Sequence, residues 1–210
     1  MSAASVADAE RRSLADLLLD LGPDEPTLCG DWTTRDLLAH LVIRERRPDA
    51  APGILLPPLA GWTERVQSQF ARRDFGELVA LMRSGPPVWS PMALPPLRGV
   101  DVQEYFIHHE DVRRARDGWS PRPPEPERDE LVWRQVALMG RLAYRKSPVG
   151  VTLRRPDGAE HAVKSGPRTV ILVGEPGELL LHAAGRDQAV VTGEGEPADV
   201  AAVQALDRGI

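Results

Sequence analysis

The residues best suited to chemistry in this chain are His40, Glu104 and His108. Glu104 and His108 are four positions apart, so on a helix their side chains lie on one face, one turn apart. Carboxylate oxygens and imidazole nitrogens are both zinc ligands, and two ligands at this spacing can reach the same ion. His40 lies among apolar residues of an earlier predicted helix, at or near its buried face. It could complete a three-ligand site inside a helical bundle.

The spacing alone leaves other interpretations open. A glutamate followed four residues later by a histidine occurs often by chance, and Glu104 and His108 could form surface ion pairs with neighbouring arginines. His40 could be a core histidine whose ring nitrogens are satisfied by ordinary hydrogen bonds. From spacing alone, these structural interpretations outweigh a metal site.

Other titratable residues near these positions are interpreted as structural. His109 lies about 100° around the helix from His108 and is expected to pack against neighbouring residues. Asp111 could orient a ligand as a supporting carboxylate, but we expect it to pair with Arg114 at the surface. The last two histidines are expected to be structural or surface residues: His161 and His182.

A site with three protein ligands would leave a fourth position for water or substrate. That pattern is typical of catalytic zinc, whereas structural zinc is normally closed by four ligands, usually including cysteines. Cys29 is the sole cysteine, so neither an internal disulfide nor a cluster of thiolate ligands can form. A bound ion would promote loss of a proton from a water or thiol and so supply a nucleophile at neutral pH.

Composition limits the class of protein. The 210 residues carry a net charge of −5 and are 42% hydrophobic, which favours a globular protein and argues against nucleic acid as the partner. No apolar run approaches the roughly 20 residues of a membrane span, and the N-terminus is too charged for a signal peptide. We expect a soluble cytoplasmic protein. The charged runs at 44–47 and 111–114 are expected to be solvated helix faces.

Helical periodicity governs about the first 145 residues. A first helix has an apolar face and stops at Gly22. A second helix begins near Thr33, where Thr33 and Asp36 form an acidic version of a capping box. Further helices are expected over three ranges: 59–83 with a break near 74–76, 100–117, and a long stretch after 126.

The pattern changes near Pro148. Two alternating runs flank Asp157 and Gly158, which is a strong hairpin signal. The remaining elements are expected to be a strand, a short helix, a strand and a last helix: 169–173, 175–184, 189–192 and 197–206. The sequence therefore predicts a helical domain over 1–147 followed by a small α+β domain over 148–210.

Three stretches of the chain resemble a known family. Residues 31–41 (DWTTRDLLAHL) resemble the start of the metal-binding helix in the DinB-like superfamily. The most similar branch is the actinobacterial group related to mycothiol-dependent maleylpyruvate isomerase. Residues 104–114 (EYFIHHEDVRR) resemble the second ligand motif of that group, and 177–186 (GELLLHAAGR) resemble its C-terminal domain. The resemblance covers nearly the whole chain.

The resemblance implies a four-helix-type bundle with a His, Glu, His metal site, followed by a small α+β domain. The matching ligands are His40, Glu104 and His108. It also implies zinc as the divalent metal and a low-molecular-weight thiol such as mycothiol, bound as thiolate at the open position.

The resemblance also suggests residues outside the ligand set. In the isomerase an arginine of the C-terminal domain helps to bind the substrate, and Arg186 is the matching candidate. The alternative role for Arg186 is a bond to a carbonyl at a helix end. Trp89 and Met92, in a Pro-rich loop, are candidates for the wall of the cofactor cleft. The alternative for both is packing of the loop onto the bundle.

These expectations combine into a metal-dependent enzyme of thiol chemistry, an isomerase or a thiol transferase. Its partners would be a small-molecule thiol and an electrophilic substrate, with neither nucleic acid nor membrane involved, and the protein would be a monomer or homodimer. The segment 44–50 and the Trp89 loop differ from the isomerase and indicate a distinct subgroup. Because fold and metal transfer between relatives better than substrate does, a metal-dependent hydrolase and a non-enzymatic metal-binding protein remain alternatives.

Overall fold

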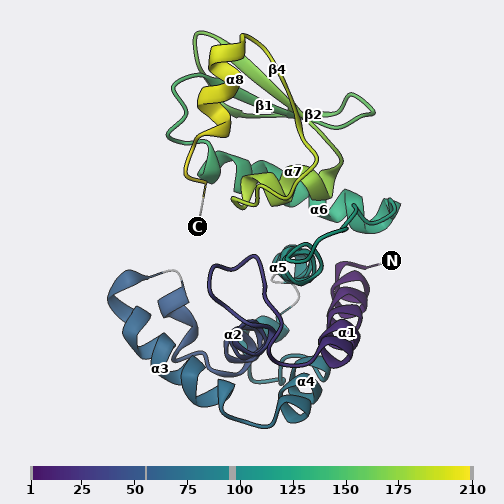
Figure 1. Ribbon diagram of the computed structural model, residues 1–210, viewed down its shortest axis with the longest axis vertical. Helices are drawn as coiled ribbons and strands as arrows, with labels where there is room; N and C mark the ends of the chain where they lie inside the picture. The colour runs from purple at the N-terminus through teal and green to yellow at the C-terminus, as the bar shows by residue number, and fades with distance from the viewer. Residues whose placement is uncertain (1, 55, 95–97, 209–210) are drawn as a thin grey trace. The chain divides into compact units, whose positions relative to one another are not determined.

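The computed structural model describes residues 2–54, 56–94 and 98–208 (Figure 1). The chain divides into two compact units, Met1–Trp119 and Ser120–Ile210. The first unit is helical, and its elements follow in chain order: α1 (Ala3–Leu21), α2 (Thr34–Arg46), η1 (Ala51–Ile54), η2 (Pro57–Leu59), α3 (Ala60–Ala71), α4 (Phe75–Arg83), η3 (Pro91–Ala93) and α5 (Arg98–Arg113).

Local signals set the ends of these helices. Helix α1 ends at Gly22, whose φ of 83° suits glycine. Helix α2 starts at the expected capping box, in which the backbone N–H of Thr33 donates to Asp36 Oδ2 at 3.1 Å. Asp74 caps α4 by accepting from the backbone N–H of Glu77 at 2.9 Å. The break expected near residue 74 therefore separates α3 from α4.

The core of the first unit is formed by α1, α2, α4 and α5. Helix α1 packs against α4 and α5, and α2 packs against α3 and α4. One continuous apolar cluster joins four of these helices, and its fully buried members include Leu14, Leu18, Leu38, Leu41, Leu78, Met82 and Tyr105. Helix α2 is buried along most of its length, so polar residues on it must find partners inside the protein.

The second unit contains a four-stranded sheet and three helices: α6 (Pro126–Ala143), β1 (Gly150–Arg154), β2 (Glu160–Lys164), β3 (Thr169–Val173), α7 (Pro176–Ala183), β4 (Thr192–Glu194) and α8 (Pro197–Gln204). The strand order is β2-β1-β3-β4. Strands β1 and β2 form the expected antiparallel hairpin around Gly158, while β1 and β3 are parallel. The last strand lies three residues later than the sequence suggests.

Helix α6 belongs to the second unit, because it packs against α7 and β2. Its Gly140 lies so close to the sheet that an added Cβ would come within 2.9 Å of Leu153 and Val163. The structural division therefore falls after Trp119, earlier than the change of pattern at 147 from which the domain boundary was expected. None of the helices in the described ranges is both long and apolar enough to cross a membrane.

Candidate metal centre

His40, Glu104 and His108 meet inside the first unit. His40 comes from α2, and the other two residues come from successive turns of α5. Oε1 of Glu104 lies 3.3 Å from Nε2 of His40 and 3.3 Å from Nε2 of His108. The imidazole rings are 5.3 Å apart between centroids and inclined at 72°. The three ligand atoms lie within 4.8 Å of one another, so one ion can contact all three.

The separations of these atoms fit a tetrahedral ion. Zinc bonds to nitrogen and oxygen of about 2.0–2.2 Å place two tetrahedral ligand atoms about 3.3–3.6 Å apart. The two 3.3 Å separations fall in that range, and in the structure without an ion the same contacts are hydrogen bonds. Two imidazoles and one carboxylate also form an accepted donor set for zinc and related divalent ions. The residues present therefore fit the metal that the sequence resemblance implies.

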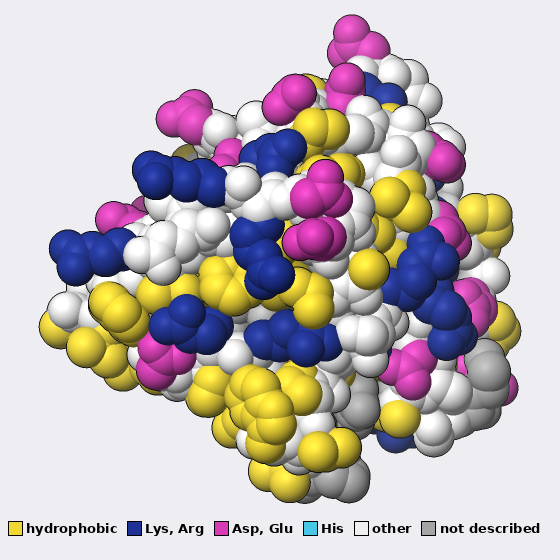
Figure 2. Space-filling view, turned by 90° about the horizontal axis from the view of Figure 1, so that it is seen from below, with side chains coloured by type: hydrophobic (Ala, Val, Ile, Leu, Met, Phe, Trp, Pro, Cys, Tyr) yellow, Lys and Arg dark blue, Asp and Glu magenta, His cyan; other side chains and the backbone are white. Residues whose placement is uncertain are grey.

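The site is largely closed to solvent. His40 is 6% exposed and His108 is 8% exposed. The indole ring of Trp32 packs against His40, with 5.2 Å between ring centroids. Figure 2 shows one face of the protein, and none of the described histidines is visible on it. A charge placed here is therefore weakly screened by water.

Burial and the neighbouring charges set the protonation of the three residues. Burial lowers the pKa of His40, against the opposing hydrogen bond with Glu104. Burial alone would raise the pKa of Glu104, but Arg44 and the two histidines outweigh it and hold that pKa well below its usual range. Burial alone would lower the pKa of His108, but hydrogen bonds with Asp111, Cys29 and Glu104 hold it well above its usual range.

Asp111 is buried, so the expectation that it lies at the surface is wrong. Its side chain is fully buried, and Oδ2 lies 3.0 Å from Nδ1 of His108. The thiol of Cys29 donates to the same oxygen at 3.0 Å. Arg114 Nε forms an ion pair with Glu110. The position of Asp111 fits the alternative role, that of a carboxylate that supports a ligand.

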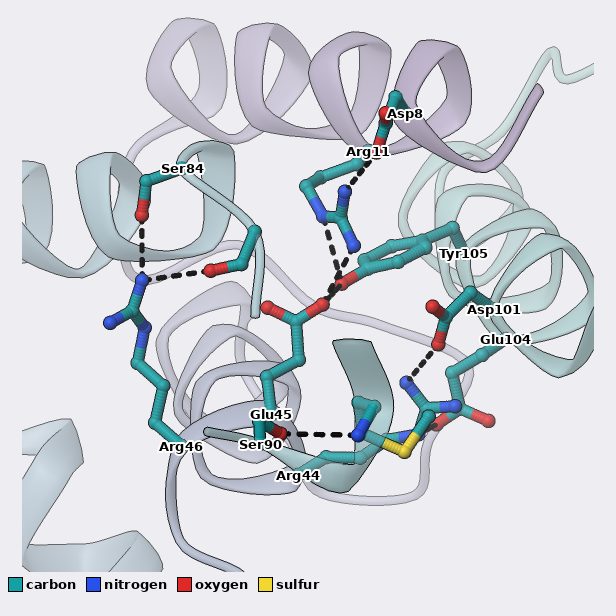
Figure 3. A network of polar contacts seen from close by, with 12 residues as sticks. Asp8, Arg11, Arg44, Glu45, Arg46, Ser84, Ser90, Asp101, Glu104 and Tyr105 are labelled. Carbon is teal, nitrogen blue, oxygen red and sulfur yellow. Dashed lines mark hydrogen bonds and ion pairs between the residues drawn. The ribbon is translucent and has the colours of Figure 1, made fainter. Parts of the chain in front are cut away.

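In the charged run at 44–47 Glu45 is buried and the three arginines are partly buried, which corrects the expectation of a solvated helix face. Arg44 Nη1 donates to Asp101 Oδ1 at 3.0 Å, and its Nε lies 3.6 Å from Oε1 of Glu104 (Figure 3). Arg46 donates to Ser84 Oγ at 2.6 Å and to two backbone carbonyls near the end of α4. These arginines face inward because α2 is enclosed by other helices.

A buried polar network lies beside the metal ligands. Figure 3 shows Arg11 from α1 and Tyr105 from α5 converging on Glu45 of α2. Arg11 Nη2 donates to Glu45 Oε1 at 2.8 Å, and the hydroxyl of Tyr105 donates to the same oxygen. Arg11 Nε also donates to the Tyr105 hydroxyl at 3.2 Å. The network ties α1, α2 and α5 together, and its Tyr105 directly follows the candidate ligand Glu104 in the sequence.

The other residues proposed from the sequence occupy separate places. Trp89 is 61% exposed in the turn before η3, and Met92 lies within η3 with its backbone N–H donating to Ser90 Oγ. Arg186 follows α7 in the second unit, where Nη1 donates to the carbonyl of Ala184 at 2.5 Å. That contact is the helix-end bond considered as the alternative for Arg186. The roles of these three residues in binding stay predictions.

Three residues near the site were not expected there from the sequence: Cys29, Arg44 and Asp101. Asp101, Glu104, His108 and Asp111 follow one another at intervals of three, four and three residues. That spacing places all four on one stripe of a helix, and it was the available signal for Asp101. No comparable local signal exists for Cys29, whose partner Asp111 is 82 residues away.

Comparison with known proteins gives a relationship of fold. No protein-family model and no curated protein sequence matches this chain. Among solved structures, mycothiol-dependent maleylpyruvate isomerase is similar, with a TM-score of 0.62 and 15% identity over 92% of this chain and 91% of that one. A variant of that isomerase with one histidine replaced by alanine gives a TM-score of 0.60 at 16% identity, with the same coverage. The chain therefore shares the fold of this thiol-dependent isomerase.

Proposed function

We propose that this protein is a metal-dependent enzyme of thiol chemistry that holds a zinc-type ion with His40, Glu104 and His108. The observation that carries the proposal is the convergence of three ligand atoms on one point, with separations that match a tetrahedral ion. Three protein ligands leave a fourth position open, which is the arrangement of catalytic sites. The shared fold with a mycothiol-dependent isomerase supports a thiol as the ligand of that position.

The protonation states of His40 and Glu104 suit them to bind an ion. The lowered pKa of His40 favours the neutral ring, the form of imidazole that can ligate an ion. The low pKa of Glu104 keeps its carboxylate ionised for the same purpose. The bound ion would supply positive charge that favours the thiolate form of a low-molecular-weight thiol such as mycothiol. Burial of the site excludes bulk water and strengthens this electrostatic effect.

The reaction that follows from this arrangement is attack by the thiolate on an electrophilic carbon of a small molecule. In an isomerase the carbon–sulfur bond would break again after rearrangement and return the thiolate. In a transferase the new carbon–sulfur bond would replace the bond to a leaving group, or the adduct would take up a proton, and the product would be a thioether. Arg186, Trp89 and Met92 are proposed to contribute to substrate or cofactor binding, as the family resemblance implies.

Binding of mycothiol tests the proposal. Isothermal titration should show mycothiol binding to zinc-loaded wild-type protein, with no binding after chelation and none to Glu104→Gln. Glu110→Gln is the matched control, because Glu110 is also a buried α5 carboxylate but pairs with Arg113 and Arg114. Loaded protein that fails to bind mycothiol or a related thiol would refute the thiol function. Turnover of esters or amides without any thiol would favour a hydrolase.

A further inference from the structure

Helix α5 presents four titratable residues in one row: Asp101, Glu104, His108 and Asp111. The inner pair supplies two of the three metal ligands described above. The outer pair is fully buried, and burial of two carboxylates is costly unless hydrogen bonds or ion pairs compensate for it. Asp111 contacts the ligand His108, and Asp101 binds Arg44, which in turn contacts the ligand Glu104.

At one end of the row, Asp111 Oδ2 lies 3.0 Å from Nδ1 of His108. This is the nitrogen that faces away from Glu104, since Nε2 makes the 3.3 Å contact with that carboxylate. A proton held on Nδ1 leaves the lone pair on Nε2, so a carboxylate at Nδ1 selects the tautomer that can ligate. Asp111 therefore fixes both the orientation of the ring and the nitrogen that is available to the ion.

Cys29 holds Asp111 in place from the segment between α1 and α2. Its thiol donates to Oδ2 of Asp111 at 3.0 Å, and the backbone N–H of Leu28 donates to the carbonyl of Asp111 at 3.1 Å. A tetrahedral zinc ion shared by a thiolate and a carboxylate would hold sulfur and oxygen about 3.6 Å apart. The shorter separation fits a hydrogen bond through which Cys29 supports the carboxylate, although Cys29, His108 and Asp111 also lie close enough together to hold an ion.

At the other end of the row, Asp101 acts through an arginine. Asp101 Oδ1 accepts from Arg44 Nη1 at 3.0 Å, and Arg44 Nε lies 3.6 Å from Oε1 of Glu104. Arg44 is itself one helical turn after His40 on α2, so it faces the same seam between the two helices. The ion pair with Asp101 fixes the guanidinium, which in turn restrains the carboxylate that must ligate.

We infer that Asp111 with Cys29, and Asp101 with Arg44, are positioning residues that hold His108 and Glu104 in ligating geometry. The inference rests on the proposed metal site and extends it to four residues that do not themselves touch the ion. Loss of supporting partners of this kind commonly lowers metal affinity by about 10- to 100-fold.

The test is the zinc dissociation constant, measured by competition with a chromogenic chelator. Asp111→Asn should weaken zinc binding about 10- to 100-fold, and Asp101→Asn should weaken it about 10-fold. Glu110→Gln is the control, because it removes a buried α5 charge next to Asp111 that pairs with Arg113 and Arg114. Its zinc affinity should stay within about twofold of wild type even if its stability falls.

Two cysteine variants test the inference independently of the buried carboxylates. Cys29→Ser keeps a hydroxyl donor for Asp111 and should bind zinc as wild type does, while Cys29→Ala should bind it several-fold more weakly. Equal zinc affinity in wild type, Asp111→Asn and Cys29→Ala would overturn the inference while leaving the metal site intact. Failure of the wild type to bind zinc at all would instead refute the proposed function.

Discussion

The second unit should lose stability in mild acid because of one buried histidine. His182 lies on α7, 8% exposed, with Nδ1 2.6 Å from the hydroxyl of Tyr144. Burial, aided by the positive charge of Arg208, lowers the pKa of His182 from 6.5 to about 4, while Asp187 has the opposite and smaller effect. In the tautomer with the proton on Nε2, the neutral ring accepts the Tyr144 hydrogen bond at Nδ1, and protonation there would remove this acceptor.

The difference in the pKa of His182 between the folded and unfolded states sets how the free energy of unfolding changes with pH. The folded state keeps His182 neutral between pH 6.5 and about 4, whereas the unfolded state takes up a proton, so stability falls as the pH falls. At about 1.4 kcal/mol for each unit of pKa difference, the full loss is on the order of 3 kcal/mol. About 2 kcal/mol of this should be lost between pH 8 and pH 5. Stability from this group is complete above pH 6.5 and gone below about pH 4.

Urea unfolding at pH 8 and pH 5, followed by a signal from the second unit, measures the effect. His182→Asn keeps an acceptor for Tyr144 but cannot titrate, so the comparison cancels the contribution of carboxylates common to both proteins. The pH-dependent difference in unfolding free energy between wild type and variant should be about 2 kcal/mol. A difference below about 0.5 kcal/mol, or an NMR titration of His182 with its midpoint near 6.5, would show that burial does not lower the pKa of His182.

Three further predictions concern the buried charges, the packing of α6 and the metal. Arg11→Met should destabilise the first unit by about 3–5 kcal/mol, because Glu45 would be left as a buried charge without its cation. Adding Glu45→Leu to the same chain should recover much of this loss, as measured by chemical denaturation. Gly140→Val should destabilise the second unit by about 1–3 kcal/mol, because the new side chain would collide with Leu153 and Val163. Zinc at 100 times its dissociation constant should stabilise the first unit by about 2.7 kcal/mol and leave the unfolding transition of the second unit unchanged. Scanning calorimetry with and without zinc measures both transitions. A shift of both transitions, or of neither, would contradict the placement of the site.

The sequence was informative where structure depends on local signals. Gly22, the box of Thr33 and Asp36, and the turn at Gly158 each specify a chain end or a reversal through a few adjacent residues, and all three occur as expected. The three candidate ligands could be proposed because Glu104 and His108 share a helix face and because His40 was expected on the buried face of another bundle helix. The family resemblance then favoured this set over the structural alternatives.

The errors arose where the outcome depends on packing between distant segments. The run at 44–47 resembles an exposed face, yet Glu45 is enclosed because partners 34 and 60 residues away surround it. Asp111 was assigned to the surface for the same reason, since a charge pattern on one helix does not reveal which helix covers it. The compact units divide before α6, whose helical periodicity does not reveal its packing on α7 and β2.

The metal content of purified variants shows whether His40, Glu104 and His108 hold an ion. Wild-type protein, His40→Ala, Glu104→Ala and the control Glu110→Gln would be loaded with zinc, dialysed and analysed by plasma mass spectrometry beside circular dichroism spectra that verify folding. We predict one zinc ion for each chain in wild type and control, and a large loss of zinc in the two ligand variants. Full zinc content in folded His40→Ala and Glu104→Ala proteins would show that these residues do not form the metal site.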